Sequence, residues 1–235
     1  MLSIVIPTLK EEDDLPRLLS SLKEQTFRDF EVIVADYNSR DHTREIAWQA
    51  GCQVVEGGKV AVGRNNGAQA AKGDWLLFLD ADVVLPNEFL SVCLSEIAER
   101  KLTVATAPIR FLSGHKIDKF FGEFYNFYAR LTQSFYPHAP GFCIFCKKEL
   151  HDKIKGFDEV VTLAEDHDYV VRAGRQGKFG LLAKSHIPVS ARRFERDGRL
   201  NIAVKYAAVE AHRIFLGQIE TDFFNYRFGH YKEKR

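Results

Sequence analysis

Two aspartates in the first half of this 235-residue chain have a spacing that could do chemistry. Asp80 and Asp82 follow an apolar run at 75–79. In an extended segment, residues two apart face the same side, so both carboxylates can point into one site. Carboxylate oxygens suit Mg²⁺ and Mn²⁺, which usually keep open positions for phosphate oxygens. The pair predicts a cation-bridged phosphate site, with a solvated turn after a strand as the alternative.

These aspartates need a scaffold that gathers strand ends. Apolar β-branched runs at 2–7, 31–36, 53–56 and 74–80 alternate with helical patterns around 12–25, 41–50 and 61–72. This order predicts a mostly parallel α/β sheet with helices on both faces. Ligands bind beyond the carboxyl ends of strands in such a sheet. We therefore expect the polar residues that follow the strands to share one rim: Pro7, Thr8, Asp36, Ser39, Asp80 and Asp82.

The pattern loosens in the second half. We expect a helix ending near 100, a strand near 102–109, an aromatic helix at about 116–135 and a strand near 142–146. A helix after Asp166, a strand near 179–184 and a polar helical tail from about 200 complete the prediction. Without a repeat or a low-complexity linker, the simplest division is one domain over 1–199, with halves meeting near 100, and a C-terminal tail at 200–235.

Composition excludes several classes of function. The 33 basic and 32 acidic residues nearly cancel, so no overall field attracts nucleic acid. No window holds the ~20 apolar residues of a spanning helix, and the N-terminal segment lacks the features of a signal peptide. We therefore expect a cytoplasmic protein that does not cross a membrane by itself.

Two sequence patterns suggest sites that closer reading excludes. Cys143 and Cys146 have C-x-x-C spacing, but residues three apart on a strand face opposite sides, so buried thiols are favoured over zinc ligands. Gly58 and Gly63 have the glycine spacing of a phosphate loop, but Arg64 and the following asparagine replace the required Lys and Ser/Thr. No G-x-G-x-x-G follows the first strand, so NAD binding loses its main support as well.

Four segments together resemble the family 2 glycosyltransferases of the inverting GT-A type. They lie in family order over about residues 2–194: SIVIPTLKEEDDL, VIVADYNSRDHT, GRNNGAQAAKGDWLLFLDADV and GFDEVVTLAEDHDYVVRAGRQG. The resemblance implies a Rossmann-like GT-A fold. It also implies transfer of a sugar, with inversion, from a nucleoside diphosphate sugar to an acceptor, assisted by Mn²⁺ or Mg²⁺. We expect this acceptor to be a saccharide or a lipid-linked group, the latter because of the aromatic segments described below.

The resemblance assigns roles at the donor site. Asp36 accepts a hydrogen bond from the nucleobase, Arg64 lies against the nucleotide, and Asp82 holds the metal. A cation and an arginine would stabilise the negative charge that develops on the leaving diphosphate. The other donor-site residues are Pro7 and Thr8 at the base pocket, Ser39 after the second strand, Asp80 at the ribose or sugar, and Ala81 between the two aspartates.

On the acceptor side, Glu165 and Asp166 match the E-D-x-D segment of the family. Asp166 is implied to be the base that takes the proton of the acceptor hydroxyl. Without the resemblance, these acids would fit a helix N-terminus, whose dipole they stabilise. Gly141 resembles the floor of the acceptor site. Arg192 and Arg193 would close over the diphosphate or an acceptor phosphate, or else form a solvated basic turn.

Tyr37 and Asn38 depart from the family pattern, because many members carry an aspartate and a glycine there. UDP and GDP both remain open, as do the sugar, the acceptor and the linkage. The alternatives to an inverting enzyme are a non-catalytic nucleotide-sugar-binding domain, a nucleotidyltransferase and a retaining GT-A enzyme.

Aromatic residues are concentrated in the helix at 116–136 and in the tail. The helix stripe is too broad for one core face, and its alternatives are core with an acceptor-site wall, a membrane contact or a homodimer interface. Residues 190–235 carry ten Lys/Arg against six Asp/Glu, interleaved with aromatics. These two segments predict peripheral contact with an anionic bilayer, at the inner face of the membrane.

Overall fold

The main sheet has buried apolar strands at its centre. The computed structural model describes residues 1–219, without the side chains at positions 192, 193, 196, 214 and 216. Strand β1 pairs in parallel with β2 on one side and with β4 on the other, and β3 pairs in parallel with β2. These strands are β1 (Leu2–Thr8), β2 (Phe30–Asp36), β3 (Gln53–Glu56) and β4 (Trp75–Phe78).

The second half of the chain extends this sheet to the order β3-β2-β1-β4-β7-β5-β8. Strand β7 (Ile144–Lys147) runs antiparallel to both of its neighbours, β4 and β5 (Val104–Thr106), whereas β5 pairs in parallel with β8 (Phe179–Leu181). The predicted mostly parallel α/β sheet is confirmed.

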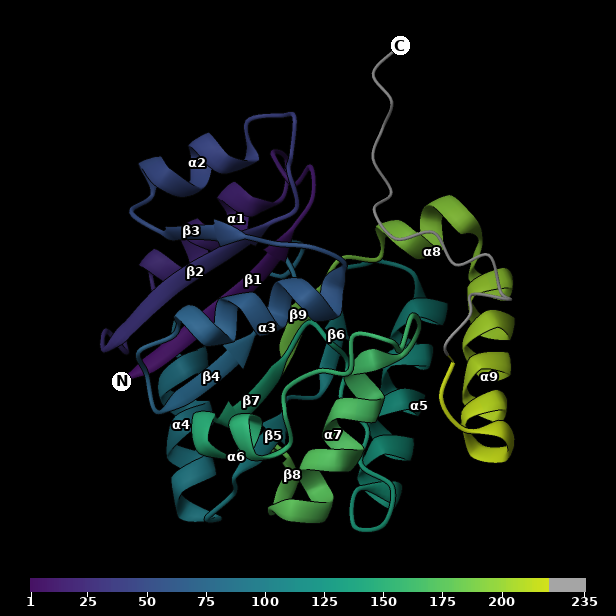
Figure 1. Cartoon of the computed structure of the whole chain (residues 1–235). Helices are drawn as coiled ribbons and strands as arrows, with labels where there is room; N and C mark the ends of the chain where they lie inside the picture. Colours follow the sequence, from purple (N-terminus) through teal and green to yellow (C-terminus); the bar gives the residue numbers. More distant parts are fainter. Residues whose placement is uncertain (220–235) are drawn as a thin grey trace.

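Successive side chains along each strand point to opposite faces of the sheet, and each face has its own hydrophobic core. Ile4 packs into one core with helices α1 (Leu15–Lys23) and α4 (Phe89–Glu99), whereas its neighbour Val5 packs into the other. The second core joins the sheet to α3 (Val60–Ala70), α6 (Lys148–Lys153) and α7 (Glu165–Gln176). Helices therefore cover both faces of the sheet, as Figure 1 shows. Helix α2 (Thr43–Gln49) packs beside α1 and β3.

The strand expected near 102–109 is wrong in extent. The chain leaves the main sheet after β5, and β6 (Ile109–Phe111) pairs with β9 (Ile187–Val189) in a separate two-stranded sheet. Pro108 separates the two strands, and proline cannot donate to a ladder. The strand expected at 179–184 ends at Leu181. The backbone N–H groups of Ala183 and Lys184 donate to the Glu96 carboxylate and not to a neighbouring strand.

Two longer helices complete the described chain. Helix α5 (Lys116–Thr132) ends before the predicted 135, and α9 (Arg199–Leu216) begins where the helical tail was expected. The short α8 (Arg192–Asp197) precedes α9, and residues 220–235 of the predicted tail lie outside the described residues. No helix in the described part of the chain combines the length and the apolar character needed to cross a membrane.

Candidate active site

The first two strand ends meet through a buried carboxylate. The register of β1 and β2 sets Thr8 opposite Asp36. Asp36 is fully buried and accepts hydrogen bonds from the Thr8 hydroxyl at 3.1 Å and from the Ser39 N–H at 3.0 Å. The Ser39 hydroxyl also donates to it, and Arg44 lies 3.6 Å away. Asp36 therefore organises the loop, so a nucleobase would have to reach a carboxylate that already accepts three hydrogen bonds.

Helix α3 carries Arg64 to the end of the sheet. A Cβ at Gly67 would lie 2.3 Å from Cγ1 of Val5, so glycine is what lets this helix approach β1. Arg64 is only 2% exposed. Its Nη1 donates to Oε1 of Glu165 at 2.8 Å, and its Nη2 donates to Oδ1 of Asp80 at 3.0 Å. The guanidinium therefore links the end of β4 to the start of α7.

Asp166 is held beside this ion pair by a backbone group. The Gly141 N–H donates to Oδ2 of Asp166 at 2.7 Å, and the other oxygen accepts the N–H of His167 at 2.8 Å. A Cβ at Gly141 would lie 2.3 Å from Nη2 of Arg64, so this glycine touches both groups. The structure thus brings together five residues named from the sequence: Arg64, Asp80, Gly141, Glu165 and Asp166.

The electrostatics of this cluster keep Arg64 charged and raise the pKa of Glu165. Burial lowers the pKa of Arg64, but the nearby Asp80, Glu165 and Asp166 raise it by more. Burial and the neighbouring Asp166 raise the pKa of Glu165 to about 7, against the lowering effect of Arg64. Burial and Asp166 thus favour the protonated form of Glu165, whereas its ion pair with Arg64 favours the charged form.

The two aspartates of the D-x-D sequence separate. Strand β4 ends at Phe78, and Ala81 and Asp82 lie in a turn, so the expected extended geometry is wrong for this pair. Asp80 turns to Arg64 and keeps 39% of its side chain exposed. Asp82 and the buried Ala81 instead line a pocket of about 200 Å³.

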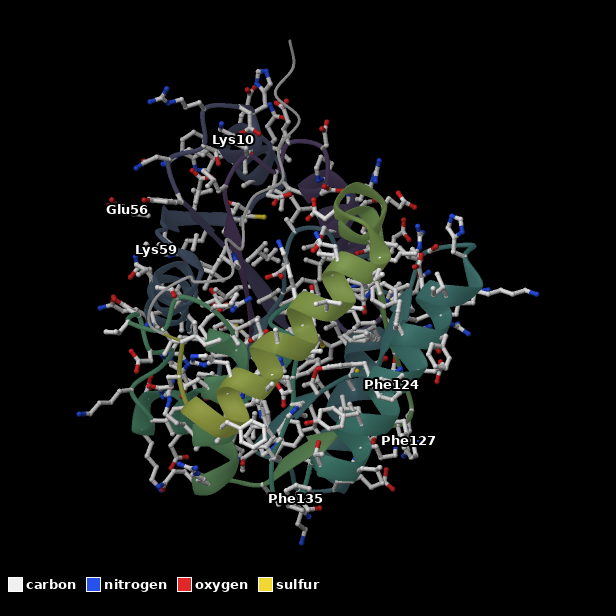
Figure 2. The ribbon with its side chains drawn as sticks, turned by 90° about the vertical axis from the view of Figure 1, so that its right-hand side faces the viewer. Lys10, Glu56, Lys59, Phe124, Phe127 and Phe135 are labelled. Carbon is white, nitrogen blue, oxygen red and sulfur yellow. The ribbon has the colours of Figure 1, made fainter. Side chains whose placement is uncertain are left out.

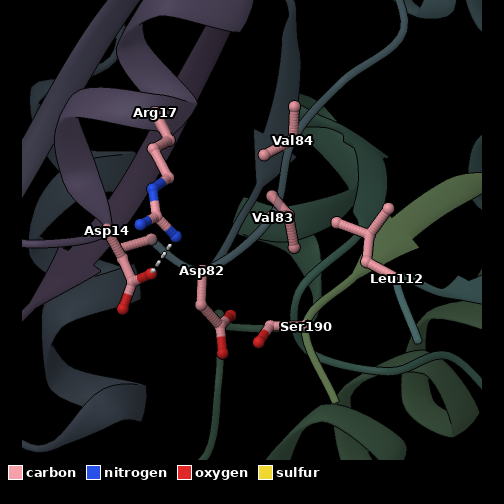
Figure 3. A pocket seen from close by; sticks show the side chains of 8 residues that line it. Asp14, Arg17, Asp82, Val83, Val84, Leu112 and Ser190 are labelled. Carbon is pink, nitrogen blue, oxygen red and sulfur yellow. Dashed lines mark ion pairs between the residues drawn. The ribbon is translucent and has the colours of Figure 1, made fainter. Parts of the chain in front are cut away.

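Distant segments supply the rest of this pocket. Its lining includes Asp14 and Arg17 at the start of α1, together with Ser190, which an antiparallel bridge between Val83 and Val189 brings beside Asp82. Figure 3 shows the Asp82 carboxylate pointing into the pocket toward Ser190, opposite the Asp14–Arg17 ion pair. The sequence reasoning missed Asp14 and Arg17, whose one signal was the acidic run after the first strand.

The donor set of this pocket fits a hard cation. Asp82 and Ser190 offer oxygen ligands, and Mg²⁺ or Mn²⁺ is commonly held by one or two carboxylates together with substrate phosphates. Among the described residues, no group of three or more His, Cys, Asp or Glu side chains is arranged as a cage for a metal. The side chains of Arg192 and Arg193, predicted to close over a phosphate, lie outside the described residues.

A second group of polar residues, with His138 buried at its centre, lies next to Asp166. The His138 Nε2 atom is 2.9 Å from Oε1 of Glu210, which also accepts the Tyr128 hydroxyl at 3.0 Å. The rings of His138 and His167 meet edge to face at 5.0 Å. Burial, with His167 nearby, lowers the pKa of His138 to about 3, so this histidine is neutral. The network fastens α9 against the helix that carries Asp166.

Comparison with known proteins places the chain in a family. The family model described as Glycosyl transferase family 2 matches residues 3–154. An uncharacterized glycosyltransferase of Haemophilus influenzae is 28% identical over 196 residues, which cover 76% of this chain and 64% of that protein. The undecaprenyl-phosphate 4-deoxy-4-formamido-L-arabinose transferase of Pseudomonas fluorescens is 37% identical over 107 residues, covering 40% of this chain and 31% of that protein.

A solved structure shares the fold. Mannosyltransferase PcManGT from Pyrobaculum calidifontis, in complex with GDP-Man and Mn²⁺, has a TM-score of 0.68 and 20% identity, covering 89% of this chain and 64% of that one. The chain therefore spans less than two thirds of each of these three proteins. The family match ends at residue 154, so it does not include Glu165 or Asp166.

Proposed function

Because the chain belongs to glycosyl transferase family 2, we propose that it transfers a sugar from a nucleoside diphosphate sugar to an acceptor, with inversion at the anomeric carbon. One observation carries the proposal. Arg64 ties Asp80 to Glu165 at the end of the sheet, and the adjacent Asp166 is held by the Gly141 N–H. A donor-side carboxylate and a candidate base therefore belong to one connected cluster.

In this proposal Asp166 is the general base. The hydroxyl oxygen of a saccharide acceptor attacks the anomeric carbon while its proton passes to the Asp166 carboxylate, which must lie within hydrogen-bond reach. A lipid phosphate would attack through an oxygen that is already ionised. The bond between that carbon and the diphosphate oxygen breaks, and its electron pair leaves with the diphosphate. The Gly141 N–H, at 2.7 Å, fixes the orientation of the carboxylate for this transfer.

The donor would lie along the rim from Pro7, Thr8 and Ser39 to Asp80. Asp80 is the group that reaches the ribose or sugar, because Arg64 itself is buried and acts through it. Asp82 would hold Mn²⁺ or Mg²⁺, which supplies positive charge that offsets the diphosphate. Arg17, in the same pocket, offers a further cation. UDP and GDP are both compatible with this arrangement.

The acceptor is proposed to be a saccharide hydroxyl or a lipid phosphate. The name of the P. fluorescens relative, an undecaprenyl-phosphate transferase, supports a lipid-linked acceptor. We also propose that the enzyme acts at the inner face of a membrane, which it contacts through the aromatic helix and the basic tail. A homodimer interface is the competing use of those aromatic residues.

Replacing Asp166 by Asn tests the proposal directly. The variant should lose turnover by about 10²- to 10⁴-fold, as expected for a general base, while donor binding stays unchanged. Asp152→Asn is the matched control, because its carboxylate is 59% exposed and pairs at 3.7 Å with Lys148. Full turnover in Asp166→Asn would indicate another base, and a product of retained anomeric configuration would exclude inversion. Donor binding without any turnover in the wild type would favour a non-catalytic binding domain.

A further inference from the structure

Helix α5 has its apolar face outside and its polar face inside. Large apolar side chains at intervals of three or four residues remain 47–64% exposed: Ile117, Phe120, Phe124, Phe127 and Leu131. The buried face of the same helix consists of small or polar residues: Asp118, Gly122, Asn126, Ala129 and Thr132. Figure 2 shows Phe124 and Phe127 projecting from the edge of α5, with Phe135 beyond its end. A surface helix of a globular protein normally has the opposite polarity.

Specific contacts fix this orientation. The Asn126 side chain accepts the N–H of Ile109 and donates to its carbonyl, both at 2.9 Å, so it clamps β6 like a neighbouring strand. Asp118 accepts two hydrogen bonds from Arg199, at 2.7 and 2.9 Å. A Cβ at Gly122 would lie 3.3 Å from the Phe111 ring, so glycine allows a close approach to this ring. Turning the apolar face inward would break all of these contacts.

The charges beside the apolar face distinguish between two partners for it, a second copy of the chain and a lipid bilayer. Three exposed basic residues, Lys116, Lys119 and Arg130, lie on α5 with one exposed acid, Glu123, so its outer surface has a net charge of +2. Two copies meeting across a two-fold axis would bring identical positive surfaces together. A basic border along one side of an apolar stripe instead matches the interface of an anionic bilayer, where cations meet headgroups and the apolar face enters the acyl boundary.

We propose that α5 is a membrane-docking helix that lies flat on an anionic lipid surface and inserts Phe120, Phe124, Phe127 and Leu131. This inference deepens the proposed function, on which its purpose rests, because it supplies the surface that presents a lipid-linked acceptor. Tyr125, on the inner side of the same helix, has a buried hydroxyl group with Asp166 among its charged neighbours. One helix therefore separates the lipid surface from the candidate base.

Vesicle co-sedimentation of the full chain tests this inference. The probes are vesicles of phosphatidylcholine alone and of phosphatidylcholine mixed with phosphatidylglycerol. We expect the wild type to bind the mixed vesicles, and the double variant Phe124→Ser, Phe127→Ser to bind them about tenfold more weakly. Trp48→Ser is the matched control, because Trp48 is a large apolar residue on α2 with a similar exposure of 59%. This control should bind like the wild type.

A second variant pair separates the charge contribution. Lys116→Gln with Lys119→Gln should weaken binding to the mixed vesicles and leave the small binding to neutral vesicles unchanged, and added salt should reproduce the loss. Absence of wild-type binding, or an equal loss in Trp48→Ser, would overturn the inference. A wild-type dimer that the Phe124, Phe127 variant splits would overturn it in favour of self-association. Nucleotide binding measured on the same samples keeps a failure here distinct from a failure of the proposed glycosyl transfer.

Discussion

Gly141 is the tightest point of the site, because its missing side chain leaves room for the Arg64 guanidinium. In Gly141→Ala, the new Cβ would lie 2.3 Å from Nη2 of Arg64, so the arginine must leave Asp80 or the turn that contains Gly141 must move away from Asp166. Since displacements of this kind cost about a hundredfold in rate, we expect kcat/KM to fall by about that factor. Steady-state kinetics would measure it. Gly114→Ala is the control, because its Cβ meets no atom within 4 Å.

Glu165 should make the stability of the protein depend on pH in a diagnostic direction. Its pKa is raised by burial and by Asp166, from 4.5 to about 7, so the folded state holds this proton more tightly than the unfolded state does. The resulting stabilisation is complete below pH 4.5 and is lost as the pH rises to about 7. Glu165→Gln, which imitates the protonated group, should not show this loss. Urea unfolding of both proteins across this range would reveal it, and parallel curves would contradict the assignment.

At this scale the sequence identified the central side chains but not how they connect. Arg64, Glu165 and Asp166 were named from motifs and do meet in one cluster. The sequence did not predict that Arg64 is buried or that Asp80 and Asp82 separate. Both features depend on the turn that follows β4 and on packing against residues from the second half of the chain. The pocket residue Arg17 was missed because α1 lies far from Ser190 in sequence and meets it only in the fold.

Helix α5 is attached to β6 by the side chain of Asn126. Asn126→Ala would leave the buried N–H and carbonyl of Ile109 without partners, and each such group costs about 1–3 kcal/mol. We therefore expect a destabilisation of about 2–4 kcal/mol in urea unfolding. Glu123→Ala on the exposed side of α5 should change stability by less than about 0.5 kcal/mol. Equal effects of the two substitutions would show that the clamp contributes little.

The elements of the first half were predictable because each strand is a continuous apolar run followed by a helical pattern. The second half was less so. Pro108 divides what reads as one strand into β5 and β6, which belong to different sheets. Short elements such as α6 and β9 have too few residues for a periodic pattern, and tertiary pairing determines them. The broad stripe of α5 was recognised as unusual, but the polarity of its buried face depends on contacts with β6 and α9.

Across the whole molecule, one sheet gathers both sides of the site. Strand β7 is inserted antiparallel between two parallel sets and places Gly141, just before it, next to Arg64 on α3. Helix α9 is fastened at one point by Asp118 and Arg199, and at another by Glu210 and His138. The boundary expected near residue 200 stays a prediction, and these contacts connect the described part of the tail to the preceding domain.

The whole fold is proposed to bind a nucleoside diphosphate through a cation. The most direct measurement is thermal unfolding of the full chain with UDP, GDP, CDP or dTDP, each with and without Mn²⁺. A ligand that binds only the folded state raises its stability by about 2.7 kcal/mol at a hundredfold excess over Kd. We expect a rise in Tm with one of these nucleotides that requires Mn²⁺ and is lost in Asp82→Asn. An unchanged Tm with all four nucleotides would contradict it.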